Sequence, residues 1–189
     1  MPELDYNIST DRFELKLLSL DDSTGIWPYV SDPEISKLMS WDAHSNISET
    51  ENFIRGVEEN FKKGKAISWG IHFNNEIIGV FSIISILRSH RSLTFDKAEL
   101  AYWLGPDYQG NGIMTEVGEQ VLNFGFTQLH LNKIYVGHHN GNRGSKGLIE
   151  RLKFKHTHIE KEAFRKDGEW IDVSYYSMLK KEYLELYKL

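Results

Sequence analysis

The 189-residue chain contains no cysteine and only four prolines. It can therefore form neither a disulfide nor a thiolate metal site, and it has no thiolate nucleophile. Because secreted proteins of this size often use disulfides, the absence favours a reducing, cytoplasmic compartment. The longest apolar runs, such as residues 77–87, end well before the roughly 20 residues that span a bilayer, so we expect no association with a membrane. Residues 1–11 are polar and acidic, and we expect no signal peptide.

Basic residues are outnumbered, with 22 lysines and arginines against 27 aspartates and glutamates, for a net charge of −5. No basic stretch is longer than Arg88-Ser89-His90-Arg91. Non-specific nucleic-acid binding depends on clustered lysine and arginine side chains. The composition therefore disfavours a nucleic-acid or ribosome-associated interaction protein, and we expect no direct nucleic-acid partner.

The rest of the composition is that of a soluble globular protein, with 40% hydrophobic and 26% charged residues. A chain of this length can build one domain with a substantial core. No proline- or serine-rich linker, internal repeat or low-complexity tract divides it. We therefore expect a single domain over residues 1–189, whose apolar pattern is compatible with a homodimer but does not require one.

Hydrophobic periodicity predicts an α+β protein. Apolar–polar alternation and β-rich runs predict strands at 13–17, 66–73, 77–87, 97–104, 133–138, 154–164 and 170–179. Three- and four-residue spacing predicts helices at 48–63, from 114 to about 130, and at 145–152. A helical or irregular region is expected before residue 39, and a polar loop between 87 and 97. This order of elements indicates a mixed sheet rather than a regular βαβ alternation.

Three short signals mark the ends of elements. Ser48 and Glu51 form a capping-box pattern at the start of the first long helix. Asn74-Asn75 predicts a tight hairpin turn, because asparagine tolerates positive φ. Lys166-Asp167-Gly168 predicts a second turn between the last two strands.

The most informative segment runs from Tyr108 to Thr115, where a strand gives way to a helix. Gly110 and Gly112 allow positive φ and let a ligand approach the backbone closely. The first turn of a helix has free N–H groups and the positive end of the dipole, which together suit a diphosphate. A tight turn that merely uses glycine explains Gly-x-Gly alone about equally well. The third glycine of the dinucleotide fingerprint is missing, as is the Gly-Lys-Ser/Thr of a phosphate loop.

The run Gln109-Gly110-Asn111-Gly112-Ile113-Met114 resembles the Arg/Gln-x-x-Gly-x-Gly/Ala signature of the GNAT acetyltransferases. In detail, the chain is most similar to the branch that acetylates ribosomal proteins at N-terminal serine or alanine. The similarity extends to residues 98–104, 114–116, 131–134, 142–154, 167–172 and 175–179. Two positions depart from the family pattern. Met114 replaces Gly or Ala at the last signature position, and Lys153 replaces the usual Gly before Phe154.

This resemblance implies a three-layer αβα fold around a mixed, mostly antiparallel, splayed sheet, with strand 97–104 diverging from strand 133–138. It implies acetyl-CoA as the co-substrate, with the pantetheine arm in the gap and the diphosphate on the N–H groups of residues 109–114. The cofactor-binding residues expected from it are Trp103, Leu104, Gln109, Gly110, Asn111, Gly112, Ile113, Met114, Thr115, Asn142 and Ser145.

The resemblance also implies an N-acetyltransferase whose acceptor is a primary amine, either a protein N-terminal α-amine or a small amine. An α-amine with a pKa near ~8 is partly neutral at pH 7, so it needs a weaker base than a lysine near ~10.4. Many relatives have a tyrosine acid at the positions of Leu148 or Ile149. Ser145 is therefore the candidate acid, with a helix cap as its alternative role.

Glu99 is the candidate base, and a structural carboxylate is its alternative role. Glu162 is a weaker candidate, because the related enzymes place a carboxylate two residues further on, where this chain has Phe164. The missing tyrosine acid leaves a non-catalytic acyl-CoA-binding module as an alternative function. A polyamine or antibiotic acetyltransferase is another.

Other conspicuous side chains receive structural interpretations. Aromatic residues of the early segment, such as Trp27 and Trp41, are expected in the core rather than in a substrate wall. His138-His139 should point to opposite faces of a strand, whereas His156 and His158 should share a face. No third ligand has suitable spacing, so we expect no metal site.

Overall fold

The computed structural model describes residues 4–188 of the chain. Its strands are β1 (Ile8–Ser9), β2 (Glu14–Leu17), β3 (Ile67–Phe73), β4 (Glu76–His90), β5 (Leu93–Leu104), β6 (Lys133–His139), β7 (Lys155–Lys166) and β8 (Glu169–Leu179). They form one sheet in the order β1-β2-β3-β4-β5-β6-β8-β7. Neighbouring strands are antiparallel except β5 and β6, which are parallel. The predicted mixed, mostly antiparallel sheet is confirmed.

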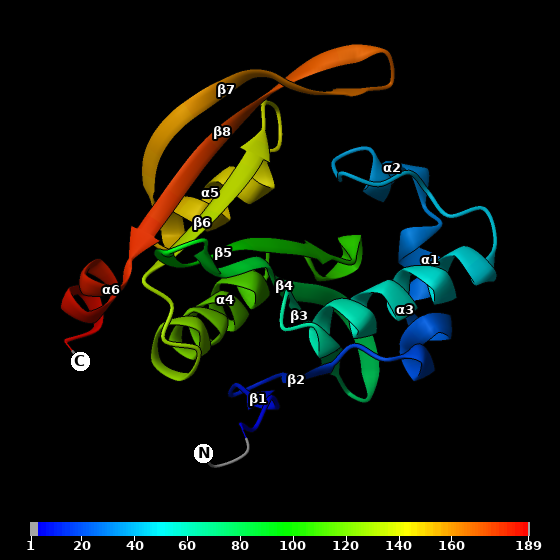
Figure 1. Cartoon of the computed structure of the whole chain (residues 1–189). Helices are drawn as coiled ribbons and strands as arrows, with labels where there is room; N and C mark the ends of the chain where they lie inside the picture. The colour runs from blue at the N-terminus through cyan, green and yellow to red at the C-terminus, as the bar shows by residue number, and fades with distance from the viewer. Residues whose placement is uncertain (1–3, 189) are drawn as a thin grey trace.

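Helices cover both faces of this sheet (Figure 1). They are α1 (Ser23–Val30), α2 (Pro33–Ser36), α3 (Ile47–Lys62), α4 (Ile113–Asn123), α5 (Arg143–Arg151) and α6 (Lys180–Tyr187). Side chains of β4 reach both faces of the sheet. Ile77 and Val80 pack in a cluster with residues of α1 and α3, whereas Ile78 and Phe81 pack with residues of α4 and α5. A register shift opposite Ile71 and His72 lets residues three apart share a face. Packing on both faces confirms the three-layer αβα arrangement. Within residues 4–188, no helix is long and apolar enough to cross a membrane.

Two regions differ from the sequence prediction. The expected polar loop between 87 and 97 is instead a hairpin, because β4 continues to His90 and β5 starts at Leu93. This extension is largely exposed and its pairing shifts register around Leu87, so it lacks the apolar alternation of a buried strand. Helix α6 was not predicted. It is held by Tyr183, which is 2% exposed and stacks on Phe126 with ring centroids 4.9 Å apart.

The cap of α3 lies two residues before the predicted one. Asn46 is the N-cap, and its side chain accepts a hydrogen bond from the amide of Glu49 at 3.2 Å. Glu49 in turn accepts from the amide of Ser45 at 2.8 Å. The prediction of Ser48 and Glu51 as the capping pair was therefore wrong, although the helix itself matches the predicted 48–63 to within one residue at each end.

The sheet is splayed between β5 and β6. Their pairing covers only Lys97–Glu99 against Lys133–Tyr135. Beyond Glu99, β5 stays paired with β4 as far as Leu104. β6 likewise stays paired with β8 as far as His139. The two strands therefore separate in a V whose arms carry the start of α4 and the start of α5, as the resemblance implied.

Candidate functional site

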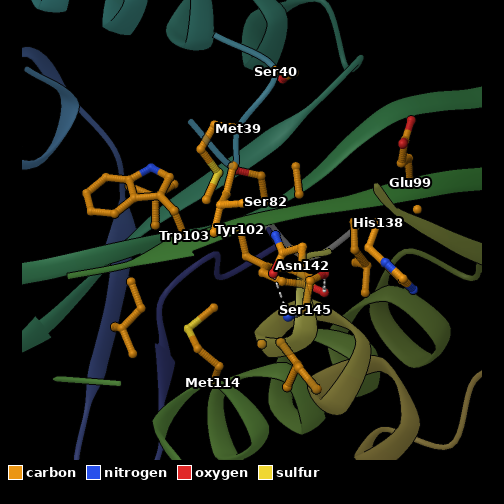
Figure 2. A pocket seen from close by; sticks show the side chains of 18 of the residues that line it. Met39, Ser40, Ser82, Glu99, Tyr102, Trp103, Met114, His138, Asn142 and Ser145 are labelled. Atoms are coloured by element: carbon orange, nitrogen blue, oxygen red, sulfur yellow. Dashed lines mark hydrogen bonds between the residues drawn. The ribbon is translucent and has the colours of Figure 1, made fainter. Parts of the chain in front are cut away.

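A cleft of about 1840 Å³ opens where β5 and β6 separate. Its walls come from the ends of both strands, the first turns of α4 and α5, and the loop between α2 and α3. Figure 2 shows Met39 and Ser40 on the side of the cleft away from Ser145 and Met114. The cleft therefore has a floor built by helix starts and an opposite wall built by a loop.

A run of free backbone amides lies on the α4 side of the cleft. Gly110 and Gly112 have φ of 79° and 76°, the left-handed conformation that glycine adopts without strain, and Gly112 is the N-cap of α4. The amides of residues 110–114 donate to no acceptor among residues 4–188. Consecutive free N–H groups at a helix N-terminus are suited to binding an anion.

This run is shorter than the predicted diphosphate-binding segment. The amide of Gln109 donates to Pro106 O at 3.1 Å, and that of Thr115 donates to Gly112 O at 3.1 Å. Both amides are thus already bonded within the chain. The Gln109 side chain donates to Leu104 O at 3.0 Å, and the Thr115 hydroxyl accepts from Arg151 Nε at 3.0 Å. The contacts of Gln109 and Thr115 therefore stabilise the loop before α4 rather than leave free groups for a ligand.

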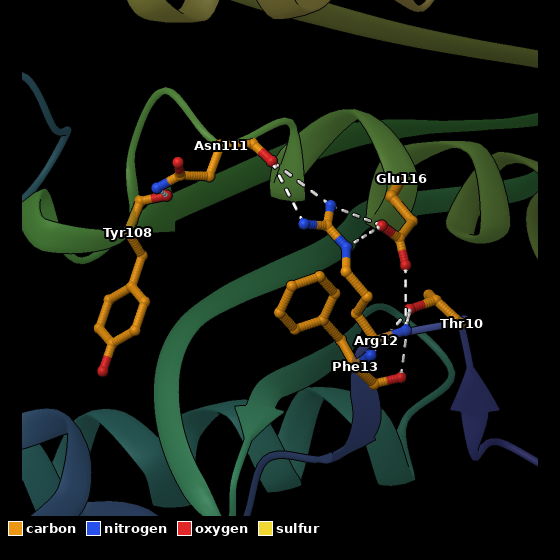
Figure 3. A network of polar contacts seen from close by, with 6 residues as sticks. All are labelled: Thr10, Arg12, Phe13, Tyr108, Asn111 and Glu116. Carbon is orange, nitrogen blue, oxygen red and sulfur yellow. Dashed lines mark hydrogen bonds and ion pairs between the residues drawn. The ribbon is translucent and has the colours of Figure 1, made fainter.

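The segment before β2, which contains Thr10 and Arg12, contacts the same loop and the first turn of α4 (Figure 3). The guanidinium of Arg12 bonds to Glu116 at 2.7–2.8 Å and to the carbonyl oxygen of Asn111 at 3.4–3.5 Å. Burial alone would raise the pKa of Glu116, but hydrogen bonds from Thr10 and Arg12 and the charge of Arg12 outweigh it and lower the pKa. Sequence reasoning missed Arg12, because no local pattern links it to a residue 104 positions away.

Four other residues predicted to bind the cofactor differ in how far their side chains reach the cleft. Trp103 lines the cleft but is only 6% exposed, and its ring packs 5.4 Å from the Tyr29 ring. Ile113 is 5% exposed and belongs to the main core. Met114 is half-buried on the cleft, whereas the Asn111 side chain turns back to Tyr108 O and Gln109 O.

Ser145, Asn142 and Tyr102 form one hydrogen-bonded group (Figure 2). Asn142 is the N-cap of α5, and its Oδ1 accepts from the amide of Ser145 at 3.0 Å. The interpretation of Ser145 as the cap was therefore wrong. Its hydroxyl instead lies 2.9 Å from the hydroxyl of Tyr102 on β5. Burial raises the pKa of Tyr102 to about 12, against the opposing effects of Ser145 and the charge of Arg151.

Glu99 also lines the cleft, on the face of β5 opposite to Tyr102. Burial raises its pKa, and a hydrogen bond from Tyr135 opposes that rise. Glu162 is exposed, and its amide donates to Asp172 Oδ1 at 3.0 Å. It is not among the cleft-lining residues, whereas Phe164 is. The structure therefore brings Glu99, but not Glu162, to the cleft.

The wall opposite the helix starts is mainly apolar and aromatic. Side chains that line it include Met39, Trp41, Phe53, Val57, Phe164 and Tyr175. Met39, Trp41 and Val57 also pack against the core cluster of α1 and α3, so the expected core role and a wall role coincide there. Trp27 packs against the same cluster outside the cleft.

The histidines do not gather into a metal site. A register shift between His156 and His158 sets the first ring against Tyr176 and the second against Tyr175. The prediction that these two histidines share a face was therefore wrong. Between residues 4 and 188, no three His, Cys, Asp or Glu side chains are grouped closely enough to hold a metal ion.

Known proteins resemble this chain over most of its length. A family model described as acetyltransferase (GNAT) domain matches residues 12–155. The N-acetyltransferase p20 of Bacillus licheniformis is 28% identical over 176 residues, 92% of this chain and 96% of that protein. The ribosomal protein uS5-alanine N-acetyltransferase of Escherichia coli is 25% identical over 172 residues, 87% of this chain and 86% of that protein. The structure of spermidine N-acetyltransferase from Vibrio cholerae, in complex with CoA and spermine, has a TM-score of 0.78 at 22% identity and covers 92% of this chain and 98% of that one.

The raised pKa of Glu99 gives a testable dependence of stability on pH. A folded protein with such a carboxyl group retains its proton where the unfolded chain has lost it, so stability falls as pH rises through that window. We expect the free energy of unfolding of the wild type to fall relative to that of Glu99→Gln as pH rises from about 4.3 towards neutrality. Urea denaturation of both proteins across this range measures the difference.

Glu59 provides the matched control. A hydrogen bond and the charge of Lys63 lower the pKa of this exposed carboxyl group. The wild type should therefore gain stability relative to Glu59→Gln as pH rises through the pKa of the unfolded chain. The same slope for both substitutions would contradict the assignment of Glu99 as a buried carboxyl group.

Proposed function

The chain belongs to the GNAT acetyltransferase family and is an acetyl-CoA-dependent N-acetyltransferase, and we propose that its acceptor is the α-amine of a protein N-terminus. One observation carries the placement of acetyl-CoA. The five free amides of residues 110–114 lie at the start of α4, at the edge of the cleft. A diphosphate accepts from several N–H groups at once and is favoured by the positive end of the helix dipole.

The splay supplies the second part of the proposed acetyl-CoA site. Because β5 has no strand partner on its β6 side after Glu99, its backbone groups from Leu100 to Leu104 can bond to an extended amide-containing arm. Such a site uses Trp103 and Leu104 through their backbones. Asn142 and Ser145 lie across the gap from this edge, at the start of α5.

The charge of the cleft favours an acceptor with a single positive charge. Among residues 4–188, three carboxylates line the cleft, and Glu116, which is paired with Arg12, and Glu119 both lie on α4. This leaves Glu99 on β5 as the carboxylate outside that helix, and the wall opposite the helix starts is mainly apolar or aromatic. A polyamine carries several ammonium groups, and each one needs a partner when it leaves water. A protein N-terminus brings one amine followed by amide groups and side chains. The relative that acetylates ribosomal protein uS5 supports the same acceptor class.

The two proton transfers of the reaction can be assigned to Glu99 on one face of β5 and to Ser145, which lies against the other face. During acetyl transfer, the amine nitrogen bonds to the acetyl carbon, the carbon–sulfur bond breaks, the amine loses a proton and the sulfur gains one. Glu99 takes the amine proton, directly or through water, and its raised pKa makes it a better base. Ser145 gives a proton to the sulfur and regains one from water, and Glu99 releases the amine proton to water, so both groups are restored.

Tyr102 fits the role of a positioning residue for Ser145. With a pKa of about 12, it keeps its proton throughout the neutral range and can donate to Ser145 Oγ at 2.9 Å. The hydrogen of the serine hydroxyl is then free to point elsewhere, into the cleft. In this way a strand tyrosine and a helix serine together replace the tyrosine that is missing at Ile149.

A negative charge placed among the free amides of residues 110–114, the proposed anion cradle, tests the acetyl-CoA site. Gly112→Asp and Gly112→Asn introduce side chains of the same size, and both residues tolerate the left-handed φ of 76°. Only aspartate brings a negative charge next to the diphosphate, where like charges cost on the order of 1–4 kcal/mol. We expect acetyl-CoA to bind at least about tenfold more weakly to Gly112→Asp than to Gly112→Asn in calorimetry. Equal affinities would rule out this loop as the anion site.

A panel of amines tests the acceptor. Thiol release from acetyl-CoA should be fastest with peptides that carry a free N-terminal alanine or serine, and the same peptides with a blocked N-terminus serve as the control. Spermidine and an aminoglycoside should react more slowly, because the cleft offers their extra charges few carboxylates. Faster turnover of spermidine would replace the N-terminal acceptor with a polyamine. Tight acetyl-CoA binding without turnover of any amine would indicate a non-catalytic acyl-CoA-binding module.

The paired hydroxyls are tested by a double-mutant cycle with the preferred peptide. Ser145→Ala should lower kcat by roughly 10²-fold, the range of general acid catalysis, with little change in acetyl-CoA affinity. Tyr102→Phe should lower kcat less, because the serine remains. Since Tyr102 acts through Ser145, the double variant should be no slower than Ser145→Ala alone. Additive losses would mean that the two hydroxyls act separately, and unchanged turnover in Ser145→Ala would remove it from the mechanism.

A further inference from the structure

The loop between α2 and α3, residues 37–46, forms the wall of the cleft that faces away from the helix starts. It carries Met39, Ser40 and Trp41 on the cleft (Figure 2). The loop belongs to neither a helix nor a strand, and its second half is tied to α1 by a hydrogen bond from the amide of His44 to Val30 O at 2.9 Å. Its first half receives further contacts from side chains later in the chain.

One lysine contacts two residues of this loop and the last residue of α2. Lys166, the last residue of β7, donates from Nζ to three carbonyl oxygens: Ser36 at 2.8 Å, Met39 at 2.7 Å and Trp41 at 3.0 Å. An ammonium group has three hydrogens, so its donor capacity is fully used. The Lys166 side chain is only 14% exposed, which makes these charge-assisted bonds stronger than those of a surface lysine.

An ion pair does not explain this arrangement. The nearest carboxylate, that of Asp42, lies 4.0 Å away and is 97% exposed, so it contributes little. A poorly exposed ammonium group is costly unless it is hydrogen-bonded, and here three carbonyl dipoles compensate it. One ammonium group thus joins three carbonyl oxygens of the segment 36–41 and fixes their relative positions.

A second contact reaches the same loop from another strand of the same arm of the sheet. His139, the last residue of β6, lies with Nε2 2.8 Å from Leu38 O. A carbonyl oxygen only accepts, so Nε2 carries the proton. The loop is therefore tied to β6 and β7 by residues more than 100 positions further along the chain. Figure 1 shows the β7–β8 hairpin reaching over towards α2.

We propose that Lys166 is a positioning residue for the acceptor, which clasps loop 37–46 to the β7–β8 hairpin and so completes the acceptor half of the cleft. This inference rests on the proposed function for the meaning of that half. The residues assigned to acetyl-CoA lie on β5 and at the starts of α4 and α5. None of them hydrogen-bonds to Lys166 or to loop 37–46, although Met39 and Trp41 pack on the cluster that contains Trp103. Loss of the clasp should therefore weaken acceptor binding and leave acetyl-CoA binding intact.

The size of the effect follows from the fraction of molecules with the loop in place. If the ordered fraction falls to about a tenth, the apparent affinity for the acceptor falls about tenfold. We expect Lys166→Met to raise the KM for the acceptor peptide by about this factor while the Kd of acetyl-CoA stays within about twofold. Hydrogen exchange of the amides in residues 37–46 should become faster in the same variant.

Lys161→Met is the matched control. Lys161 lies on the same strand, its side chain is 74% exposed, and it pairs with Asp172 at 2.6 Å. This variant removes the same charge and should change neither the acceptor KM nor the exchange of the loop. Lys166→Arg keeps the charge but not the tetrahedral donors, so it should restore affinity only in part. The Kd of acetyl-CoA shows whether each variant is folded.

The possible results distinguish failure of the Lys166 proposal from failure of the proposed acceptor. Peptide turnover by the wild type, with unchanged KM and unchanged loop exchange in Lys166→Met, would overturn the clasp alone. An equal rise of KM in Lys161→Met would also overturn it, because the effect would then be one of general charge. Absence of turnover by the wild type would overturn the proposed acceptor role, and faster loop exchange in Lys166→Met would still show that the lysine holds the loop.

Discussion

The hydrogen-bond ladder between β5 and β6 stops after Glu99 and Tyr135, and each strand then follows its other neighbour in the sheet. A ladder that ran the whole length of these strands would close the sheet and leave no gap between the starts of α4 and α5. Its early end instead frees one backbone edge of β5 and opens a cleft beside it. It also leaves Glu99 at the apex of the V, where burial raises its pKa. The proposed anion cradle, thioester site and base all depend on this one interruption.

Most predictions that held rest on local signals. Positive φ at Asn74, Asn75, Gly110 and Gly112 follows from residue types that tolerate it. The errors arise where tertiary packing chooses between equal local signals. Asn46 and Ser48 can each cap a helix, and each is followed three residues later by glutamate.

Other features carry no local signal at all. The hairpin extension around Arg91 is exposed, so its sequence has no apolar alternation to reveal it. The shift that separates His156 from His158 depends on how β7 pairs with β8. The contacts of Arg12 with Asn111, and of Lys166 with the loop after α2, join segments about a hundred residues or more apart. Only folding brings such partners together, which is why one sequence predicts the cofactor loop but not what holds it.

One half of the cleft presents mainly backbone groups and the other mainly side chains, and this difference bears on function. The proposed acetyl-CoA half presents backbone amides and a free strand edge, which many sequences can supply provided that glycine stands at positions 110 and 112. The proposed acceptor half presents side chains of a loop to which Lys166 and His139 hydrogen-bond. A few substitutions there can change the acceptor without disturbing the fold. Relatives named for a ribosomal protein and for spermidine, 25% and 28% identical to this chain, fit that division. We therefore infer that the acceptor is decided by the wall that Lys166 contacts, and overall identity to either relative says little about it.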